Sequence, residues 1–496
     1  MSRSGTCRRT APRLAVFTAA LVFAGHVLAG VDDFPATPPA AGPAPTLQLP
    51  TPWVQTLANG LQVISVTRAG PPLVTAQLVV RSGGEMDPPR LAGLAELTAE
   101  LLDKGAAGKT APQIAAAAEA LGGSLDAAAD WDQSTVGITV TTPKLATALA
   151  LLAEVVRQPD FSEAELKRAK AQAVDDLRLA LSRPTALAAL AASRAVFGGG
   201  AYGHSRRGTP ASLARIDRAD VRRLHQALYR PDNAILILTG DITPAQAQQL
   251  AQASFGDWRK PATPLPPRPA GATAGVLPPI LLIDQHGAGQ AGVVAAHAAP
   301  PRGDQDYIVG TVANAVLGGS YSARLNEEIR IKRGLSYGAS SQLRAFAGGG
   351  IWLAAAQTKN PSAAQVLDLM LGQFKRLAST PVPAAELAAR KATLVGTYGR
   401  RLETTAGLAA EVAALAVNGI GLDELGKYSA KVQAVTPRQI ENYARSHLAR
   451  HASVVVVGDA GAFAAAIGKE HPKAVLMESS ALDLDSPSLQ AAAPGE

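Results

Sequence analysis

Two glutamates near the start of the sequence have the spacing of a functional pair. In the stretch LAGLAELTAELLDKGAAGKT, residues 91–110, Glu96 and Glu100 are four positions apart with Ala99 between them. Residues at i and i+4 of a helix project from the same face. Two carboxylates on one face can share a cation or can simply face solvent, and the rest of the chain must decide between these roles.

A second candidate pair lies in GGSYSARLNEEIRIKRGLSYGASSQLRAF, residues 318–346. This pattern predicts a helix with Ser322 as its N-cap that ends near Gly334, and a strand that begins at Leu335. Arg330 then lies in the last helical turn, and Tyr337 follows seven residues later across the turn.

Arginine and tyrosine are suited to binding a peptide. The planar arginine fork can bind a peptide carbonyl while staying charged, and a tyrosine can donate a hydrogen bond to a developing oxyanion. The alternative is structural: Arg330 could pair with Asn326 or Glu327 one turn back, and a tyrosine in a strand usually belongs to the core.

The elements that must position these side chains form a repeat. A chain of 496 residues with 47% apolar and 18% charged residues is typical of a soluble protein with two or more domains. The segments at residues 228–255 and 448–467 both pass from a basic turn into a β-branched strand, Gly-Asp and an alanine-rich helix. We therefore predict an α+β chain with two homologous α/β sandwich domains in tandem, each a mainly antiparallel sheet with helices packed on it.

The periodicity also predicts individual elements. In the first copy, strands are expected at residues 54–57, 61–67, 73–80 and 135–141, and helices at residues 91–104, 111–120, 143–156 and 162–182. In the second copy, a strand at residues 289–297 is followed by a helix that begins at residue 306.

Composition shifts divide the chain further. We predict a signal peptide at residues 1–29, a flexible lead-in at 30–50, an N-terminal domain at 51–258, a linker at 259–279, a C-terminal domain at 280–470 and a tail at 471–496. The linker contains seven prolines and no helical pattern. The tail is mildly acidic, and we expect it to be frayed.

The N-terminus predicts export. Four arginines within the first 13 residues precede an uncharged run of 15 residues that closes on Val-Leu-Ala, so cleavage is expected after Ala29. This run is shorter than the roughly 20 apolar residues that a spanning helix needs. The sequence therefore predicts an exported, periplasmic protein without a stable membrane anchor.

Cysteine content and charge exclude several functions. The only cysteine, Cys7, lies inside the predicted signal, which excludes a disulfide, a cysteine nucleophile and a Cys-zinc site in the mature chain. Loss of the four signal arginines lowers the net charge from +7 to +3. Without a dense basic run interleaved with aromatic residues, no nucleic-acid binding is predicted.

One histidine pair has the spacing of metal ligands. His447 and His451 are four residues apart, but Arg450 stands where a catalytic base would be needed. The matching segment of the first copy contains Pro231, which marks the end of its helix, so His451 is predicted to lie in a turn. We interpret the two residues as surface histidines.

Three glycine-containing motifs have structural interpretations. GLSYG, residues 334–338, matches Gly-x-Ser-x-Gly around Ser336, but a nucleophile elbow runs from strand to helix and this stretch is predicted to run from helix to strand. The runs at residues 197–203 and 346–352 lack the Lys-Ser/Thr that follows a phosphate loop. We interpret both runs as turns or bulges where backbones approach closely.

The order of motifs resembles the insulinase/pitrilysin family of zinc metallopeptidases. The resemblance is seen in four segments: RSGGEMDPP, GLAELTAELLDKGAAGKT, ALGGSLDAAADWDQSTVGITV and RPTALAALAASRAVFGGGAYGHSRRGTPASLARI. The resemblance extends over both copies, residues 51–468.

The family binds zinc through His-x-x-Glu-His and a glutamate about 76 residues further on, and its central glutamate takes a proton from the metal-bound water. The resemblance places Glu96 and Glu100 at the two histidine positions, Ala99 at the base position and Asp176 at the third ligand position. Loss of a positioned base alone costs about 10²- to 10⁴-fold in rate. We therefore expect no zinc site and no other cofactor in this chain.

Two interpretations of the three carboxylates stay open. In the first they are a solvated face, where Glu100 pairs with Lys104 at i+4 and Asp176 caps or pairs locally. In the second, Glu96, Glu100 and Asp176 hold a hard cation such as Ca²⁺ or Mg²⁺. The sequence supplies no carbonyl-rich loop for such a cation, so we favour the first.

The resemblance gives Arg330 and Tyr337 a role. In the family, an arginine and a tyrosine at this spacing face the zinc site and hold the substrate backbone and the oxyanion. Some members divide these parts between two chains that form a clamshell around unfolded peptides, and this chain resembles the half without zinc. The implied partner is a His-x-x-Glu-His-bearing chain, and the alternative is a catalytically dead structural or peptide-binding homologue, like the respiratory-complex core proteins.

Overall fold

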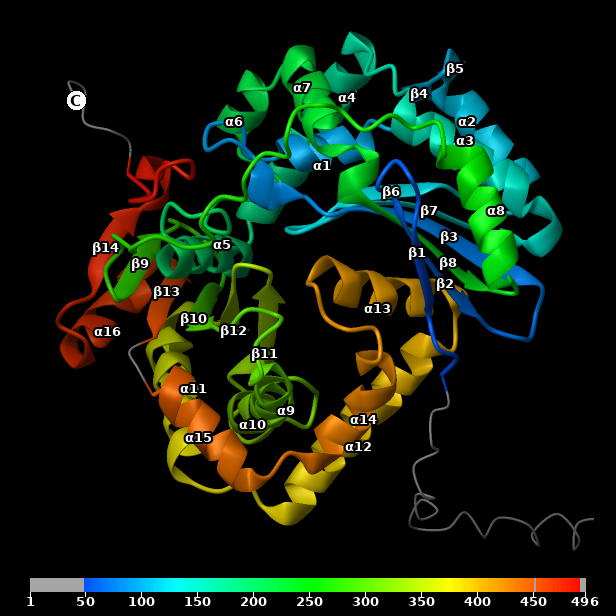
Figure 1. Cartoon of the computed structure of the whole chain (residues 1–496). Coiled ribbons are helices and arrows are strands. Elements are labelled where there is room, and N and C mark those ends of the chain that lie inside the picture. Colours follow the sequence, from blue (N-terminus) through cyan, green and yellow to red (C-terminus); the bar gives the residue numbers. More distant parts are fainter. Residues whose placement is uncertain (1–48, 450–451, 491–496) are drawn as a thin grey trace, which may run out of the picture. The chain divides into compact units, whose positions relative to one another are not determined.

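The computed structural model describes residues 49–449 and 452–490, which contain two six-stranded mixed sheets (Figure 1). The predicted signal and almost all of the predicted lead-in lie outside these residues. The first sheet has the strand order β1-β2-β8-β3-β7-β6. All neighbouring strands in this sheet pair antiparallel, except β2 and β8, which pair in parallel. Its strands are β1 (Trp53–Thr56), β2 (Gln62–Thr67), β3 (Leu73–Val80), β6 (Asp126–Ala129), β7 (Ser134–Thr141) and β8 (Ala234–Gly240).

The second sheet repeats this topology and confirms the predicted two-domain α+β fold. Its order is β11-β12-β10-β13-β9-β14, in which β9 pairs in parallel with β13 and β14. Read from β14, the order matches that of the first sheet, except that the edge strand comes from the tail. The strands are β9 (Ile280–Asp284), β10 (Ala291–Ala299), β11 (Ser336–Phe346), β12 (Gly349–Thr358), β13 (Ser453–Gly458) and β14 (Val475–Glu478).

Helices follow the predicted periodicity in the first half. They are α1 (Leu94–Glu100), α2 (Ala111–Ala120), α3 (Leu145–Arg157), α4 (Glu163–Leu181), α5 (Pro184–Phe197), α6 (Pro210–Arg215), α7 (Arg218–Leu228) and α8 (Pro244–Phe255). The predicted helix at residues 91–104 was too long. Gly93, at φ 93°, begins the helix in the left-handed region, and after Glu100 the chain turns into a short hairpin of β4 (Gly105–Ala106) and β5 (Lys109–Thr110).

The helices of the second half are α9 (Tyr307–Leu317), α10 (Arg324–Asn326), α11 (Ala363–Ser379), α12 (Ala384–Leu402), α13 (Thr405–Val417), α14 (Glu424–Ala434), α15 (Pro437–His447) and α16 (Ala464–Glu470). No helix in the described part of the chain has the length and apolar character that a membrane span requires.

The two halves exchange helices. Helix α5, from the first half, packs on the second sheet, and α13, from the second half, packs on the first sheet (Figure 1). Glycines allow both close approaches: a Cβ at Gly292 would lie 2.4 Å from the Thr185 nitrogen, and one at Gly240 would lie 3.0 Å from Thr405 Cγ2. Thr405 also accepts a hydrogen bond from Thr239 through its carbonyl at 2.8 Å. Each sheet is therefore buried partly by the other half.

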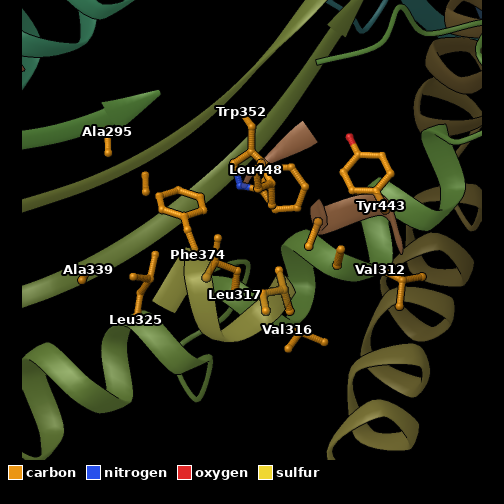
Figure 2. Close-up of a cluster of buried hydrophobic side chains, with 14 of the residues drawn as sticks. Ala295, Val312, Val316, Leu317, Leu325, Ala339, Trp352, Phe374, Tyr443 and Leu448 are labelled. Carbon is orange, nitrogen blue, oxygen red and sulfur yellow. The ribbon is translucent and has the colours of Figure 1, made fainter. Parts of the chain in front are cut away.

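The second sheet carries a large core on the face opposite α5. Trp352, Phe374 and Tyr443 are buried between β10 and β12 on one side and α9, α11 and α15 on the other (Figure 2). The rings of Trp352 and Tyr443 have centroids 5.7 Å apart. This core fixes α9 and the strand β11 that follows α10.

The tail is ordered, so the prediction of a frayed end was wrong for its described residues. Strand β14 covers the edge that β9 would otherwise expose, which removes an open row of backbone hydrogen-bonding groups. Further on, Leu489 is fully buried among residues of α5 and the second sheet. Asp485 accepts hydrogen bonds from Thr209 Oγ1 at 2.7 Å and Arg215 Nη1 at 2.9 Å. The tail thus joins the second sheet to the first half.

The predicted linker contains neither helix nor strand, and it packs against a glycine run. The Ala201 amide donates to the Ala270 carbonyl at 2.9 Å, and the Thr273 amide donates to the Phe197 carbonyl at 3.0 Å. The run at residues 197–203 is therefore a place of close backbone approach, as predicted.

Candidate functional site

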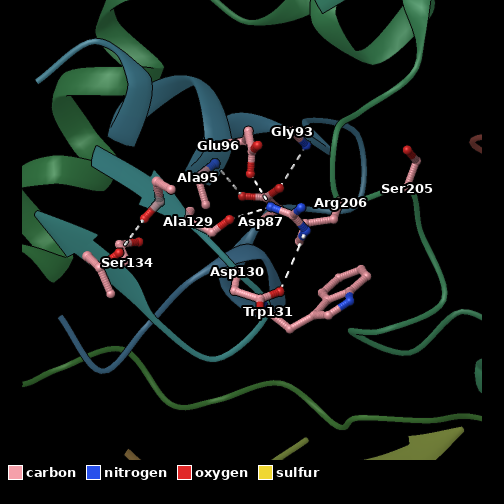
Figure 3. Close-up of polar contacts among 12 residues, drawn as sticks. Asp87, Gly93, Ala95, Glu96, Ala129, Asp130, Trp131, Ser134, Ser205 and Arg206 are labelled. Carbon is pink, nitrogen blue, oxygen red and sulfur yellow. Dashed lines mark hydrogen bonds and ion pairs between the residues drawn. The ribbon is translucent and has the colours of Figure 1, made fainter. Parts of the chain in front are cut away.

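Helix α1, which carries the two glutamates, is anchored at its start by a buried carboxylate. Asp87 accepts hydrogen bonds from the amides of Gly93 at 2.7 Å and Ala95 at 2.8 Å (Figure 3). These amides are among those that a helix leaves free at its N-terminus. Burial raises the pKa of the Asp87 carboxyl well above its usual range, and the two amide contacts act in the opposite direction.

Glu96 is paired with an arginine that is distant in the sequence. Arg206 Nη1 donates to Glu96 Oε2 and to the carbonyl of Ala129, the last residue of the edge strand β6 (Figure 3). Arg206 Nε also lies 3.7 Å from Asp130 Oδ1. Burial raises the pKa of Glu96, and the positive charge of Arg206 partly offsets this rise. The first histidine position of the resembled motif therefore holds an internal ion pair.

Glu100 and Asp176 lie in the same hollow as Glu96. A cavity of about 270 Å³ is lined by all three carboxylate residues, with Gln172 and Arg207 among its other walls. Gln172 Nε2 donates to Asp176 Oδ1 at 2.9 Å. Burial raises the pKa of Glu100; Lys104 opposes the rise, and Glu96, Asp103 and Asp176 add to it. The structure thus brings together positions that are up to 80 residues apart in the sequence.

The predicted ion pair between Glu100 and Lys104 is absent from the described residues. Lys104 Nζ lies 2.7 Å from Asp103 Oδ1 instead. The reason is the early end of α1: Lys104 falls in the turn after the helix, so the i, i+4 geometry that the pair requires does not extend to it.

The residues at the zinc-site positions of the resembled motif, and those around them, do not fit a zinc ion. Ala99 is fully buried against Ala95 and Ala129, and its methyl group cannot accept a proton. Arg206 places a fixed positive charge beside Glu96, where a metal would meet electrostatic repulsion. Within residues 49–449 and 452–490, no group of three or more His, Cys, Asp or Glu side chains is arranged to hold a metal ion.

Arg330 lies in a π-helical turn, Glu327–Ile331, that continues α10. The Lys332 amide donates to the Glu327 carbonyl at 2.9 Å, which is the i→i+5 bond of such a turn. Turns of this kind inside helices occur frequently at functional sites. The Arg330 guanidinium carbon lies 4.9 Å from the Tyr321 ring centroid and 5.2 Å from that of Tyr337.

Tyr337 projects away from the protein. Its side chain is 92% exposed, so it is not the core residue that the structural alternative expected. The proposed partners of Arg330 are also engaged elsewhere. Asn326 Nδ2 donates to the Tyr321 carbonyl at 2.6 Å, and Glu327 lies 3.1 Å from Lys332 Nζ. The Arg330 side chain makes no hydrogen bond or ion pair with the described part of the chain.

The segment before Arg330 is fixed by buried polar contacts. Arg324 is 5% exposed and donates two parallel hydrogen bonds to Glu386 on α12, at 2.9 and 2.8 Å. The prediction that Ser322 is the N-cap was wrong, because Ala323 begins the helix without a side-chain cap. Arg390 donates to Ser322 Oγ at 2.7 Å, so this hydroxyl is used for tertiary packing.

The remaining sequence candidates have no catalytic arrangement. Ser336 follows the π-helical turn and begins β11, so the order is helix then strand, as predicted, and its Oγ is hydrogen-bonded to the carbonyls of Gly338 and Gln357 at 2.6 Å. His447 ends α15, and His451 lies outside the described residues. Sequence reasoning missed Arg206 and Tyr321. Arg206 is 110 residues from Glu96, and no local pattern connects them.

Two family models match consecutive parts of the chain. Residues 62–209 match insulinase (peptidase family M16), and residues 215–394 match the peptidase M16 inactive domain. The first range contains Glu96, Glu100 and Asp176, which line the hollow beside α1 (the α1 hollow). The second range contains Arg330 and Tyr337.

Two relatives are about a quarter identical to this chain over most of its length. An uncharacterized zinc protease of Streptomyces coelicolor is 24% identical over 415 residues, which cover 81% of this chain and 88% of the relative. An uncharacterized zinc protease of Mycobacterium tuberculosis is 24% identical over 432 residues, 85% of this chain and 97% of the relative.

Solved structures share the fold. The structure of a peptidase M16 inactive domain from Pseudomonas fluorescens superimposes with a TM-score of 0.77 at 25% identity, covering 82% of this chain and 98% of that chain. A protease from Helicobacter pylori gives 0.77 at 19% identity, with 83% and 100% coverage. Complex III2 from Candida albicans gives 0.69 at 15% identity, with 83% and 96% coverage. The last two matches concern the fold alone.

Proposed function

The chain belongs to the insulinase family, peptidase family M16, and we propose that it is the subunit without zinc in an exported two-chain peptidase. The observation that carries this proposal is the state of Arg330 and Tyr337. The arginine has no ion-pair partner among the described residues, and the tyrosine is 92% exposed. Both side chains are therefore accessible to a peptide or to a partner chain.

The two side chains would act on a peptide bound by the partner chain. The Arg330 guanidinium would donate hydrogen bonds to a substrate carbonyl, and the Tyr337 hydroxyl would donate one to the oxyanion that develops during hydrolysis. Zinc in the partner, a chain with His-x-x-Glu-His, would supply the activated water. The cation–π contacts with Tyr321 and Tyr337 limit the directions in which Arg330 can point.

The residues at the zinc-site positions of the resembled motif support the division of labour. Glu96 has its own cation in Arg206, and Ala99 leaves no proton acceptor between the two glutamates. A chain with this hollow would depend on a partner for the chemical step. The match of residues 215–394 to the peptidase M16 inactive domain agrees with a non-catalytic role.

Assembly and metal content test this proposal together. The chain is co-expressed with a His-x-x-Glu-His-bearing chain of the same family, sized, and analysed for zinc and peptide cleavage. We expect a heterodimer whose zinc belongs to the partner, while the isolated chain holds no stoichiometric zinc and cleaves no peptide. One tightly held zinc per isolated chain, lost on Glu100→Ala, would refute the proposal. So would exclusively monomeric chains at micromolar concentration.

A structural or peptide-binding homologue is the second candidate. It is favoured by the same Arg206–Glu96 pair, which engages the side chain at the first histidine position, and by the likeness in fold to a chain of complex III2 from Candida albicans. The two candidates differ in whether Arg330 and Tyr337 contribute to catalysis.

Export to the periplasm is part of the proposal and rests on residues 1–29, which lie outside the described part of the chain. Cell fractionation of the full chain and of a form that begins at residue 30 would test it. We expect the full chain in the periplasm with its N-terminus at residue 30, and the shortened form in the cytoplasm. Cytoplasmic retention of the full chain would contradict it.

A further inference from the structure

The first half carries a second cavity, which lies outside the α1 hollow. It has a volume of about 600 Å³ and lies between the end of α3, helix α7 and the start of the linker. Four arginines line it: Arg157, Arg222, Arg230 and Arg259. No aspartate or glutamate is among its lining residues. The charge that attracts an anion here depends on how many of these arginines lack a carboxylate partner.

Two of these arginines have their own carboxylates. Arg230 is 2% exposed and donates to both oxygens of Asp232, at 2.6 and 2.9 Å. Its Nη1 also donates to the Thr263 carbonyl at 2.8 Å. Arg157 lies 2.8 Å from Asp257, which is 76% exposed. These two guanidinium groups are therefore held in place and largely neutralised.

The other two arginines are available. Arg222 projects from α7 and Arg259 from the start of the linker, and both are exposed. Neither side chain makes a hydrogen bond or ion pair with residues 49–449 and 452–490. The cavity thus combines a fixed wall, made by Arg157 and Arg230, with two guanidinium groups that lack protein partners.

Buried aromatic residues also line the cavity. Phe161, Tyr229 and Trp258 are at most 8% exposed, and the His225 ring stacks on Tyr229 with centroids 4.8 Å apart. His225 Nε2 donates to the Val156 carbonyl at 2.8 Å. Burial lowers the pKa of His225 to about 4, so the imidazole is neutral at pH 7 and adds no charge.

We propose that this cavity binds a small multivalent oxyanion, either a phosphate group or a polycarboxylate, between Arg222 and Arg259. Arginine suits both chemistries, because its fork matches the geometry of phosphate and carboxylate oxygens. A bound anion would connect α7 to the start of the linker. The proposal concerns the isolated chain and is independent of the peptidase partner.

Calorimetric titration of the full mature chain tests the proposal. Inorganic phosphate is the first probe and citrate the second, each at an ionic strength held constant with sodium chloride. We expect saturable binding of at least one of them, and the tighter of the two identifies the source of the oxyanion. Arg222→Ala and Arg259→Ala should each weaken that binding by about tenfold, since each removes charge-assisted hydrogen bonds.

The matched control is Arg438→Ala. Arg438 is an exposed arginine on α15, so its loss changes the net charge equally without touching the cavity. This variant should bind the anion like the wild type. Absence of saturable binding with both probes would overturn the proposal. Wild-type affinity in both Arg222→Ala and Arg259→Ala would overturn it as well, and equal weakening in Arg438→Ala would show that only net charge matters.

Discussion

Glu85 is expected to make the stability of the chain depend on pH. It lies in the turn between β3 and α1, is 2% exposed, and accepts a hydrogen bond from the Gly83 amide at 2.7 Å. The nearest cation is Arg268 of the linker, at 3.8 Å. Burial raises the pKa of the Glu85 carboxyl from 4.5 to about 8, so the folded chain keeps it protonated at neutral pH.

The direction of this pH dependence follows from the number of protons bound in the folded and the unfolded state. Between about pH 4.5 and 8, the unfolded chain releases the Glu85 proton and the folded chain retains it. The unfolding free energy should therefore fall as the pH rises through this window, by about 1.4 kcal/mol per pH unit from this group alone. Above pH 8 both states are ionised, and the contribution becomes constant.

The substitution Glu85→Gln isolates this contribution. The amide keeps an oxygen for the Gly83 amide but does not titrate. Urea unfolding at pH 5, 6.5 and 8 should show that the variant gains stability relative to the wild type, by roughly 4 kcal/mol between pH 5 and 8. The control is Glu119→Gln on the exposed face of α2, which should leave the pH dependence unchanged. Parallel curves for the wild type and Glu85→Gln would refute the reasoning.

Two further predictions concern long-range contacts. Leu489→Ala should lower the unfolding free energy by about 2–5 kcal/mol, because the side chain is fully buried. The control Leu179→Ala, at a side chain that is 70% exposed, should change it little. Equal urea midpoints for the two variants would show that the tail does not hold the halves together. Arg206→Ala should lower the unfolding free energy by about 1–3 kcal/mol, because it leaves the half-buried Glu96 without its cation. Arg206→Lys should recover only part of this loss. Urea unfolding at pH 7 measures both variants, and wild-type stability in Arg206→Ala would contradict the importance of the pair.

The sequence predicts the repeated elements because hydrophobic period and turn residues are local signals. Strand β3 and helix α2 have the predicted bounds, and the repeat implied two similar sheets. The exchange of α5 and α13 could not be predicted this way. An apolar helix has the same pattern whether it packs on its own sheet or on that of the other half, so only tertiary packing decides.

The candidate site was likewise predictable only in part. Glu96, Glu100 and Asp176, which the resemblance singled out, line one hollow. The resemblance did not supply Arg206, whose contact with Glu96 spans 110 residues. The prediction of a frayed tail was wrong for a related reason. A strand as short as Val475–Glu478 has little local sequence signal, and it is stabilised by parallel pairing with β9, which is distant in the sequence.

The catalytic role of Arg330 and Tyr337 is the central claim, and the activity of the assembled complex tests it most directly. Peptide cleavage is measured for heterodimers that contain the wild-type chain, Arg330→Ala or Tyr337→Phe, after sizing confirms that each variant still assembles. Loss of one oxyanion donor typically costs about 10²- to 10³-fold in turnover, and we expect losses of this order in both variants. Arg330→Lys should also be impaired, because a point charge does not reproduce the planar fork. Full activity with both Arg330→Ala and Tyr337→Phe would contradict the account and leave the chain a structural subunit.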